Sequence, residues 1–319
     1  MYKIAYLLAG VLLSSTAVGK VQGEELKFAH ALSIGTAGSG EGQFRYVEDF
    51  AFGKDGSLLV TDASHGFVQA LDPITGKFLG RFGGKGEEDH NLEKPEGIAV
   101  DNNGNIFVAD YSTGFIKKFS ATFNLLQTFA GYGSDLGQTI KSEFMDVHNE
   151  RLYVPDVGND RINVFSLTGE PLFNFGGEGA SLGKLNNPES AKFDSKGTLF
   201  VTDLKNNRVQ AFDENGTFLF AFGKEGTERG EFRAPAGLAV DRHDNLYVTE
   251  IGNNRVQVFS NTGQFLSTFG QKGAAQRDLN APHGIIVEKR SGRIYVADTG
   301  NNRIQVFQPL STKTEGASQ

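Results

Sequence analysis

The chain has 319 residues, of which 39% are hydrophobic and 22% charged, and it includes 41 Gly and 27 Phe but no Cys and no Trp. The Phe and aliphatic content is enough to build a core, which excludes a disordered chain, and the lack of Cys excludes disulfides, thiolate metal sites and Cys nucleophiles. The formal charge of -7 argues against nucleic acid as a main partner, because phosphate binding needs a surface rich in Lys and Arg.

The first 23 residues have the pattern of a secretory signal peptide. Lys3 precedes the apolar run 4–13, which is followed by the stretch 14–19, rich in small residues, and then by residues 21–23, which end at Gly23. These are the charged, apolar and cleavage regions of such a signal, and the apolar run is about half the length of a membrane span. We therefore expect residues 1–23 to be removed, at a cleavage site that the sequence leaves open. The mature protein is expected to be secreted or periplasmic, with no membrane span.

A unit of 46 to 48 residues repeats six times after this segment. Each copy ends with an acidic residue that follows a short apolar run, as in IFVAD and LYVTE. The six closing acids are Asp62, Asp110, Asp156, Asp203, Glu250 and Asp298, which are separated by 48, 46, 47, 47 and 48 residues. A constant period of this length over most of a chain indicates a repeat architecture.

Each unit contains four short apolar runs that are separated by polar turns. In the fifth unit the runs cover residues 237–240, 246–249, 256–259 and 264–269. The runs are rich in β-branched and aromatic residues, and the gaps contain Gly, Asn and Asp, which tolerate the positive φ angles of tight turns. Four strands per unit and six units predict an all-β, six-bladed β-propeller of four-stranded antiparallel blades over residues 24–308.

The two ends of the repeat region are complementary. The sixth unit stops after the run 304–307 and lacks its last strand, whereas an unassigned run at 25–35 precedes the first unit. We predict that this N-terminal run is the outermost strand of the last blade, because such closure removes the open sheet edges of the ring. The polar tail 309–319 is expected to be disordered, and the protein is expected to be a monomer.

Three motifs recur in these units: Pro-x-Gly-(Ile/Leu)-Ala-Val-Asp, then (Leu/Ile)-(Tyr/Phe)-Val-(Ala/Thr)-Asp, then Gly-Asn-Asn-Arg-(Ile/Val)-Gln-Val-Phe. Together they resemble the NHL-repeat family of six-bladed propellers. The last motif is nearly intact at 203–212, 250–259 and 298–307 and is kept at 156–165. The resemblance implies a non-catalytic platform that binds an extracytoplasmic protein, peptide or glycan through its top face, the face where the innermost strands begin.

The same resemblance leaves an enzymatic alternative open. The NHL-fold peptidyl-hydroxyglycine amidating lyases hold zinc with several channel histidines, and only His283 stands at such a position here. The related gluconolactonase-like propellers hold their metal with a carboxylate and Asn or Asp ligands. We therefore favour the non-catalytic function and keep a metal-dependent lyase or lactonase-like hydrolase as the alternative.

In four units the closing acid is followed five residues later by an Arg. The pairs are Asp156 with Arg161, Asp203 with Arg208, Glu250 with Arg255, and Asp298 with Arg303. The two residues flank one tight turn, so we expect a charge-assisted pair, although the four Arg could instead serve an anionic ligand.

The first two units lack this Arg. Phe67 and Phe115 stand in its place, which leaves Asp62 and Asp110 without that partner. Exposed aromatic rings beside free carboxylates predict a partner-binding surface formed by these four residues. The alternative is that both rings pack under the neighbouring blade.

The residue between Pro and Gly at the start of the innermost strand is acidic in four units. Read round the ring, the aligned residues are Glu48, Glu96, Glu143, Glu189, Ala236 and His283. Because innermost strands line the channel of a propeller, these side chains are predicted to converge at one mouth. Four carboxylates and an imidazole could hold a divalent cation, of which Ca²⁺ or Mg²⁺ suits the oxygen ligands best. The alternative is an acidic, solvated mouth without an ion.

Overall fold

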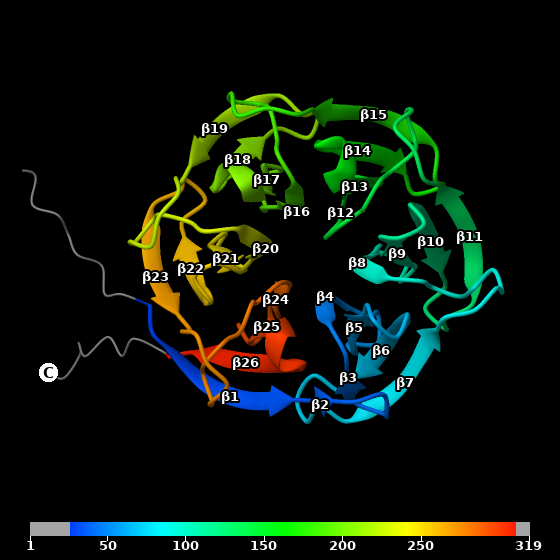
Figure 1. Ribbon diagram of the computed structural model, residues 1–319, viewed down its shortest axis with the longest axis horizontal. Helices are drawn as coiled ribbons and strands as arrows, with labels where there is room; N and C mark the ends of the chain where they lie inside the picture. Colours follow the sequence, from blue (N-terminus) through cyan, green and yellow to red (C-terminus); the bar gives the residue numbers. More distant parts are fainter. Residues whose placement is uncertain (1–25, 311–319) are drawn as a thin grey trace, which may run out of the picture.

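A computed structural model describes residues 26–310, which form a closed ring of six four-stranded antiparallel sheets around a central axis (Figure 1). The predicted all-β, six-bladed propeller is therefore confirmed. In residues 26–310, helix is limited to three short 3-10 turns, η1 (Val157–Asn159), η2 (Leu204–Asn206) and η3 (Thr299–Asn301). Within the described residues no helix has the length and apolar character needed to cross a membrane. The predicted signal peptide lies outside this range.

Each blade runs from an innermost strand near the axis to an outermost strand at the rim. Blades 1 and 2 consist of β4 (Val47–Phe52), β5 (Leu58–Asp62), β6 (Phe67–Leu71), β7 (Phe78–Gly83), and of β8 (Pro95–Val100), β9 (Ile106–Asp110), β10 (Phe115–Phe119), β11 (Leu125–Ala130). Blades 3 and 4 consist of β12 (Asp146–His148), β13 (Arg151–Asp156), β14 (Arg161–Ser166), β15 (Pro171–Gly176), and of β16 (Pro188–Phe193), β17 (Leu199–Asp203), β18 (Arg208–Phe212), β19 (Phe218–Phe222).

Blades 5 and 6 complete the ring. They consist of β20 (Pro235–Val240), β21 (Leu246–Glu250), β22 (Arg255–Phe259), β23 (Phe265–Phe269), and of β24 (Ile285–Val287), β25 (Ile294–Asp298), β26 (Arg303–Pro309), β1 (Phe28–Ile34). Between blades 6 and 1, β2 (Thr36–Ala37) and β3 (Gln43–Phe44) form a short parallel pair.

The N-terminal strand closes the last blade, as the sequence predicts. β1 pairs antiparallel with β26, from Phe28 opposite Pro309 to Ile34 opposite Ile304. Pro309 was expected to begin a disordered tail but is the last residue of β26, so the ordered chain extends further than predicted. Residues 311–319 of that tail lie outside the described residues.

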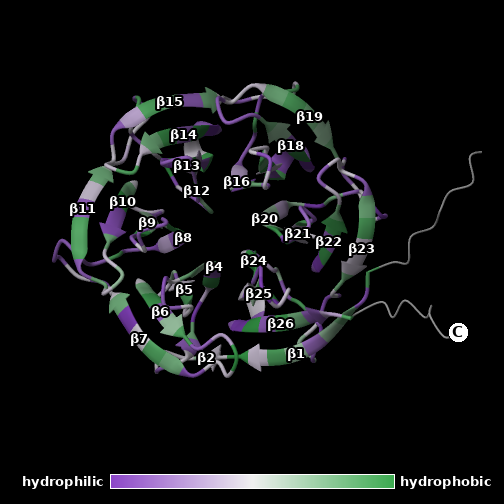
Figure 2. Cartoon of the chain, turned by 180° about the vertical axis from the view of Figure 1, so that it is seen from behind, coloured by the Kyte–Doolittle hydropathy of each residue, from purple (hydrophilic) through white to green (hydrophobic). Residues whose placement is uncertain are grey.

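The hydrophobic core is divided into six clusters, each between two neighbouring blades. In the cluster that joins blade 6 to blade 1, Tyr295 and Ile304 pack with Phe50 and Leu58. Both faces of every blade are therefore covered, whereas the outermost strands β7 and β11 alternate between partly buried and exposed residues at the rim (Figure 2). No blade can move without exposing apolar surface of its neighbours, which makes the ring a rigid support for the residues at its two openings.

Candidate functional site at the top of the channel

The innermost strand is irregular at its start, where it carries the predicted acidic residues. In blade 2, Pro95 pairs with Asp110 and Ile98 with Val108, so the two residues between Pro95 and Ile98 leave the regular ladder. The same shift occurs in blades 1, 4 and 5. A β-bulge redirects side chains away from the two faces of a sheet. In these four blades the bulge contains the aligned residue, which is Glu48, Glu96, Glu189 or Ala236.

Neighbouring innermost strands approach each other closely at this bulge. A Cβ on Gly97 would overlap the carbonyl oxygen of Glu143 in the next blade, and a Cβ on Gly284 would overlap that of Glu48. Gly284 also donates its N–H to the Glu48 carbonyl at 2.9 Å. The Gly of the Pro-x-Gly motif is therefore needed for backbone contact between blades, and this contact draws the opening together.

The four aligned Glu residues lie at this opening, which we call the acidic mouth, and they are nearly fully buried. Their exposed fractions are 2% for Glu48, 3% for Glu96, 6% for Glu143 and 8% for Glu189. They come from four consecutive blades, and the charge of Glu96 raises the pKa of each of the other three. The structure thus brings the predicted residues together, but in a buried cluster.

Burial raises the pKa of all four carboxyl groups. The pKa of Glu48 and of Glu143 lies well above its usual range, and that of Glu189 rises to about 8, first because of burial and then because of the Glu96 charge. Burial also raises the pKa of Glu96, although its hydrogen bond with Glu143 and the charge of Lys94 oppose the rise. At neutral pH the acidic mouth therefore retains protons, and its negative charge is favoured at Glu96.

His283 lies at the same opening as a neutral imidazole. Burial lowers its pKa to about 4, and the nearby charge of Lys94 acts in the same direction. Its Nδ1 lies 3.0 Å from the carbonyl oxygen of Ala281, to which the neutral ring donates. The centroid of the Tyr46 ring lies 5.7 Å from that of the imidazole.

The residues of the acidic mouth do not fit a bound cation. Glu96 forms an ion pair with Lys94, and Glu189 accepts a hydrogen bond from the Asn187 amide at 2.5 Å. Within residues 26–310, no group of three or more His, Cys, Asp or Glu side chains is arranged to hold a metal ion. The arrangement is a network of buried acids, and the predicted Ca²⁺ or Mg²⁺ site finds no support in it.

Two tyrosines and two lysines lie beside the acidic mouth, on the side of blades 1 to 3. The Lys94 ammonium lies 4.0 Å from the ring centroid of Tyr111 and 5.8 Å from that of Tyr46, and the Lys141 ammonium lies 5.7 Å from that of Tyr111. Burial and the carboxylate charges of the mouth raise the pKa of Tyr46 to about 12 and raise that of Tyr111 further. Both phenols therefore stay protonated and can donate hydrogen bonds to a ligand.

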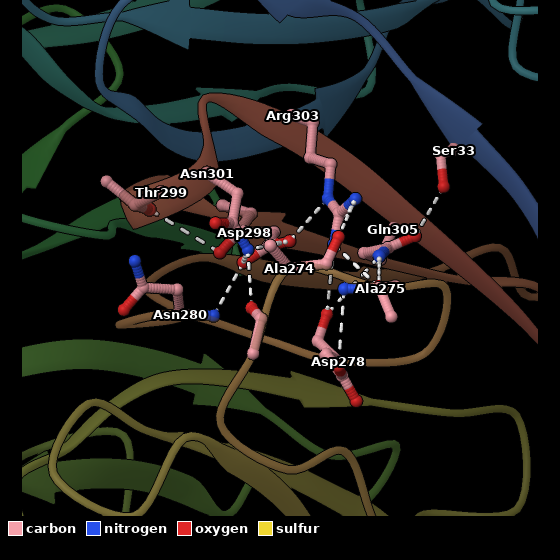
Figure 3. Close-up of polar contacts among 12 residues, drawn as sticks. Ser33, Ala274, Ala275, Asp278, Asn280, Asp298, Thr299, Asn301, Arg303 and Gln305 are labelled. Carbon is pink, nitrogen blue, oxygen red and sulfur yellow. Dashed lines mark hydrogen bonds and ion pairs between the residues drawn. The ribbon is translucent and has the colours of Figure 1, made fainter.

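The Gly-Asn-Asn-Arg turn binds the segment that connects one blade to the next (Figure 3). Arg303 donates from Nε to Asp298 at 2.6 Å and from its two Nη atoms to the carbonyls of Ala274 and Ala275 at 2.9 Å. Asn301 donates to the same carboxylate at 2.9 Å. The predicted pairs form in all four units, at Asp156, Asp203, Glu250 and Asp298. These Arg side chains are occupied by the protein, so the alternative of an anionic ligand is not supported.

The residue before this Arg ties each blade to the following one. Asn302 accepts a hydrogen bond from the N–H of Tyr46 at 2.9 Å, which joins blade 6 to blade 1. Equivalent bonds run from the amides of Asn187, Ala234 and Ala281 to Asp160, Asn207 and Asn254. In blades 1 and 2 the position is occupied by Gly66 and Gly114, which have no side chain to form this bond.

Asp62 and Asp110 are buried and hydrogen-bonded, so the prediction of free carboxylates is wrong. Asp62 Oδ2 lies 2.9 Å from Nδ1 of His65. Asp110 accepts the backbone amides of Glu93 and Lys94 at 2.8 and 3.2 Å. A buried carboxylate needs hydrogen-bond partners. In the absence of the Arg, His65 is such a partner for Asp62, and the backbone amides of the connection are partners for Asp110.

The two Phe residues at the Arg position differ in exposure. Phe67 is half-buried, with the guanidinium of Arg81 4.1 Å from its ring centroid. Phe115 is 40% exposed, and Tyr132, which follows the strand paired with that of Phe115, is 66% exposed. Of the two predicted rings, only that of Phe115 is therefore exposed, and Tyr132 is a second exposed ring beside it.

Sequence reasoning missed Tyr46, Lys94, Tyr111 and Lys141. Three of them had a signal, because they stand two residues before the aligned acids of blades 1, 2 and 3. Extending the alignment by two residues would have placed them at the same opening. Tyr111 had no such signal, since it directly follows a closing acid in a turn.

The repeat family is supported by comparison with known families. A family model described as NHL repeat matches residues 92–119, 232–259 and 279–307, which lie in blades 2, 5 and 6. Together with the six-bladed ring, these matches show NHL repeats arranged as a propeller.

Among curated proteins, the chain is similar to a probable peptidyl-alpha-hydroxyglycine alpha-amidating lyase from Caenorhabditis elegans. The two are 33% identical over 114 residues, a stretch that covers 34% of this chain and 32% of the lyase. The likeness therefore spans about a third of each protein.

Solved structures share the fold at low sequence identity. A gluconolactonase from Xanthomonas campestris superposes with a TM-score of 0.65 and 14% identity, over 88% of this chain and 99% of that one. An auxiliary nutrient binding protein from Bacteroides thetaiotaomicron gives 0.66 and 14%, over 90% and 78%. A virginiamycin B lyase from Staphylococcus aureus gives 0.62 and 13%, over 90% and 100%. At such identities the likeness shows the fold alone, and the fold serves both binding proteins and enzymes.

Proposed function

We propose that this NHL-repeat six-bladed β-propeller is an exported, non-catalytic platform that binds a protein, peptide or glycan through its top face. The observation that carries the proposal is the set of four aromatic residues at the top face of blades 1 and 2, with Tyr46 and Tyr111 beside Lys94 and with Phe115 and Tyr132 at the turn before β10. These are the blades that lack the Arg of the repeat. We call these four residues the aromatic sector. Export is supported by the signal-like pattern of residues 1–23.

The aromatic sector has the character of a recognition surface. Tyr46 and Phe115 are each 40% exposed and Tyr132 is 66% exposed. Aromatic residues are enriched in the parts of surfaces that bind partners, because they bury a large area and lose little side-chain entropy. Lys94 and Lys141 flank Tyr111 and provide hydrogen-bond donors beside it.

The test compares a variant of the aromatic sector with a matched control. In the variant Phe115→Ser with Tyr132→Ser, both exposed rings are removed without touching a buried carboxylate. The control, Leu219→Ser, removes an apolar side chain that is 49% exposed on the outermost strand of blade 4. On peptide and glycan arrays we expect the double variant to lose the ligands that the control and the unmodified protein retain. Equal binding by all three proteins would contradict the proposal.

A second candidate is a lyase or lactonase-like hydrolase, and one feature of the mouth favours it. Glu143 and Glu96 are hydrogen-bonded to each other, and their environments differ because only Glu96 also contacts Lys94. Two carboxyl groups held in different protonation states can act as general acid and general base. Turnover of a lactone or of a peptidyl-hydroxyglycine that is lost in Glu143→Gln would favour this candidate over the binding platform.

A further inference from the structure

The opposite end of the channel holds a cavity that the proposed function does not use. Its volume is about 960 Å³, within the range of sites that bind small organic molecules. It is lined by the ends of the innermost strands and by the turn Glu288–Arg293 of blade 6, which lie away from the acidic mouth. We call it the lower cavity.

The wall of the lower cavity is mainly apolar. Phe52, Val100, Val240 and Ile286 line it from blades 1, 2, 5 and 6, and each is partly accessible to solvent. Apolar side chains left accessible in a concave site are typical of pockets that hold a hydrophobic ligand body.

Two charged residues interrupt this wall. The fifth position of the aligned innermost strands is Ala51, Ala99, Ala239 or Ile286 in four blades, whereas blades 3 and 4 have Asp146 and Lys192 there. Both charged residues line the lower cavity. A charge on an otherwise apolar wall needs a compensating partner, which limits the ligands that the cavity can accept.

Contacts within the protein hold both charged groups in place. Lys192 donates from its ammonium to the carbonyl of Met145 at 2.6 Å, and Asp146 accepts the N–H of Phe193 at 2.9 Å. Each group still has hydrogen-bonding capacity, because an ammonium has three donors and a carboxylate has about four acceptor sites. The inner end of the lower cavity therefore offers fixed polar groups to a ligand.

Acidic groups outnumber basic groups at this inner end. Asp49 is 1% exposed, and its charge interacts with those of Lys192 and Asp146. Burial raises the pKa of Asp49 to about 6, a rise that the Lys192 charge opposes, so its carboxyl group is largely ionised at neutral pH. Two acidic side chains, those of Asp49 and Asp146, thus accompany the single ammonium of Lys192, and only Asp146 and Lys192 line the cavity. A cationic amine would balance this excess of acidic groups.

The outer end of the lower cavity has the opposite charge. The turn of blade 6 carries Glu288, Lys289, Arg290 and Arg293, all of which line the cavity. Three cations and one carboxylate give this rim a net charge of +2. An anionic group on a ligand would be favoured there.

From this pattern of charge we infer that the lower cavity binds a small apolar zwitterion. The amine lies at the inner end against Asp146, the hydrophobic body contacts Phe52, Val100 and Val240, and the acidic group lies at the rim near Arg290. The site is separate from the aromatic sector, so it extends the proposed function by a second ligand and does not depend on it.

The first experiment compares three probes of one length by isothermal titration calorimetry of the full-length protein at neutral pH. 8-Aminooctanoate has both charges, octanoate lacks the amine, and octylamine lacks the acid. We expect 8-aminooctanoate to bind at least about tenfold more tightly than either, since each end adds one charge-assisted hydrogen bond. Equal or tighter binding of octanoate or octylamine, or the absence of binding by all three, overturns the inference.

Two variants test which residue binds the amine of the ligand and which binds its carboxylate. Asp146→Asn keeps an oxygen that can accept from Phe193, and it should remove the advantage of 8-aminooctanoate over octanoate. Arg290→Gln, at an exposed residue, should reduce the advantage over octylamine instead. Glu170→Gln, an exposed acid on blade 3, is the control and should change neither. If Asp146→Asn leaves the preference for the amine unchanged, the inner end is wrongly assigned and the inference fails.

Discussion

Blades 3 to 6 and blades 1 and 2 use different side chains to bind the segment that leads into each blade from the preceding one. In blade 4, Arg208 joins the buried carboxylate of Asp203 to the carbonyls of Ala180, Ser181 and Lys184 in the preceding connection. In blade 2 no Arg is present, and the ammonium of Lys117, two positions further along the strand, donates to two carbonyls of the connection instead. The comparison shows that each connection needs a donor from the blade, but that the donor need not be the Arg of the motif.

The replacement changes what the top face exposes. An Arg at this position lies over the turn and has its donors satisfied by the protein. Where Phe115 replaces it, the same place presents an aromatic ring that is 40% exposed. Blade 2 therefore keeps the fold but exposes an aromatic ring where blades 3 to 6 have a satisfied Arg.

The strongest test of this difference removes the Arg from an intact blade. Arg208→Ala should lower the free energy of unfolding by about 3 to 5 kcal/mol, because it leaves the fully buried Asp203 carboxylate without its ion-pair partner. The change also removes a donor from three carbonyls of the connection, of which Lys184 keeps its bond from Gln210 and Ser181 keeps its bond from the N–H of Lys184. Urea denaturation at neutral pH measures it.

The matched substitution in blade 1 is Phe67→Ala. Asp62 there relies on His65 and on the backbone amide of Arg45, so we expect this change to cost about 1 to 2 kcal/mol, from the contact of the ring with the Arg81 guanidinium and part of its buried area. Equal losses of stability in Arg208→Ala and Phe67→Ala would show that blades 1 and 4 do not differ in how the closing acid and the connection are bound.

A second test restores a residue of the motif where it is missing. Gly114→Asn would supply the side chain that, in blades 3 to 6, accepts a hydrogen bond from the backbone of the following blade. We nevertheless expect it to destabilise the protein by about 1 to 3 kcal/mol. A Cβ at Gly114 would lie 2.5 Å from the carbonyl oxygen of Thr139 and 2.8 Å from the Cα of Tyr132. The connection packs closer to the turn in this blade than an Asn allows.

Thermal unfolding of Gly114→Asn beside Asn207→Gly separates the two effects. Asn207→Gly removes the tie in blade 4 and should cost about 1 kcal/mol, the value of one hydrogen bond. A gain of stability in Gly114→Asn would show that blades 1 and 2 have only lost the motif and have not been repacked around glycine.

The fold could be predicted from the sequence because it depends on periodic features. The six closing acids fixed the number of blades, and the unpaired run at 25–35 fixed the closure through β1. The pairing of each acid with its Arg followed from the shortness of the turn. These inferences need only local geometry and a repeat length, both of which the sequence contains.

The candidate sites were predicted less well because burial is not local. The alignment placed the four Glu at one opening, but their protonation depends on how closely the blades approach through Gly97 and Gly284. Asp62 and Asp110 were judged free because the backbone amides that bind Asp110 belong to the connection, whose path no motif encodes. Asp146 and Lys192 are the charged residues at the fifth position of the innermost strands, which is apolar in the other four blades. Comparing this position across the six repeats would have identified them.

Blades 1 to 4 carry a Glu at the acidic mouth, whereas blades 5 and 6 carry Ala236 and His283. The buried Glu residues predict that the free energy of unfolding depends on pH. Unfolded Glu189 has its ordinary pKa of 4.5, whereas in the folded protein it keeps its proton up to about pH 8. Between these values the folded state binds more protons, so the free energy of unfolding falls as pH rises. The expected slope is about 1.4 kcal/mol per pH unit for each carboxyl group that behaves in this way.

The clearest window for this measurement is pH 6.5 to 8. Below it, His283 acts in the opposite direction, because its pKa falls from 6.5 to about 4 on folding. In Glu48→Gln, which removes one buried titrating group, the decrease of stability across this window should become shallower. The surface variant Glu170→Gln should keep the full slope. A slope that is the same in both variants would show that Glu48 is ionised in the folded protein.

The smallest effect is expected where blade 2 is returned to the usual residue of the repeat. Gln210, at the position of Lys117 in blade 4, donates to the connection at 2.6 Å and to Asp203 at 3.0 Å. Lys117→Gln should therefore keep one bond to the connection and gain one to Asp110. Burial lowers the pKa of Lys117, so removing the ammonium also removes a desolvation cost. These changes oppose each other, and we expect stability to change by less than about 1 kcal/mol.

Lys117→Met provides the reference for that small effect. It fills the same space but leaves the carbonyls of Asp89 and Asn91 without their donor, which should cost about 2 kcal/mol. If Lys117→Gln destabilises the protein as much as Lys117→Met, an amide cannot replace the ammonium in blade 2. The connection of that blade would then depend on the charge of Lys117, much as those of blades 3 to 6 depend on their Arg.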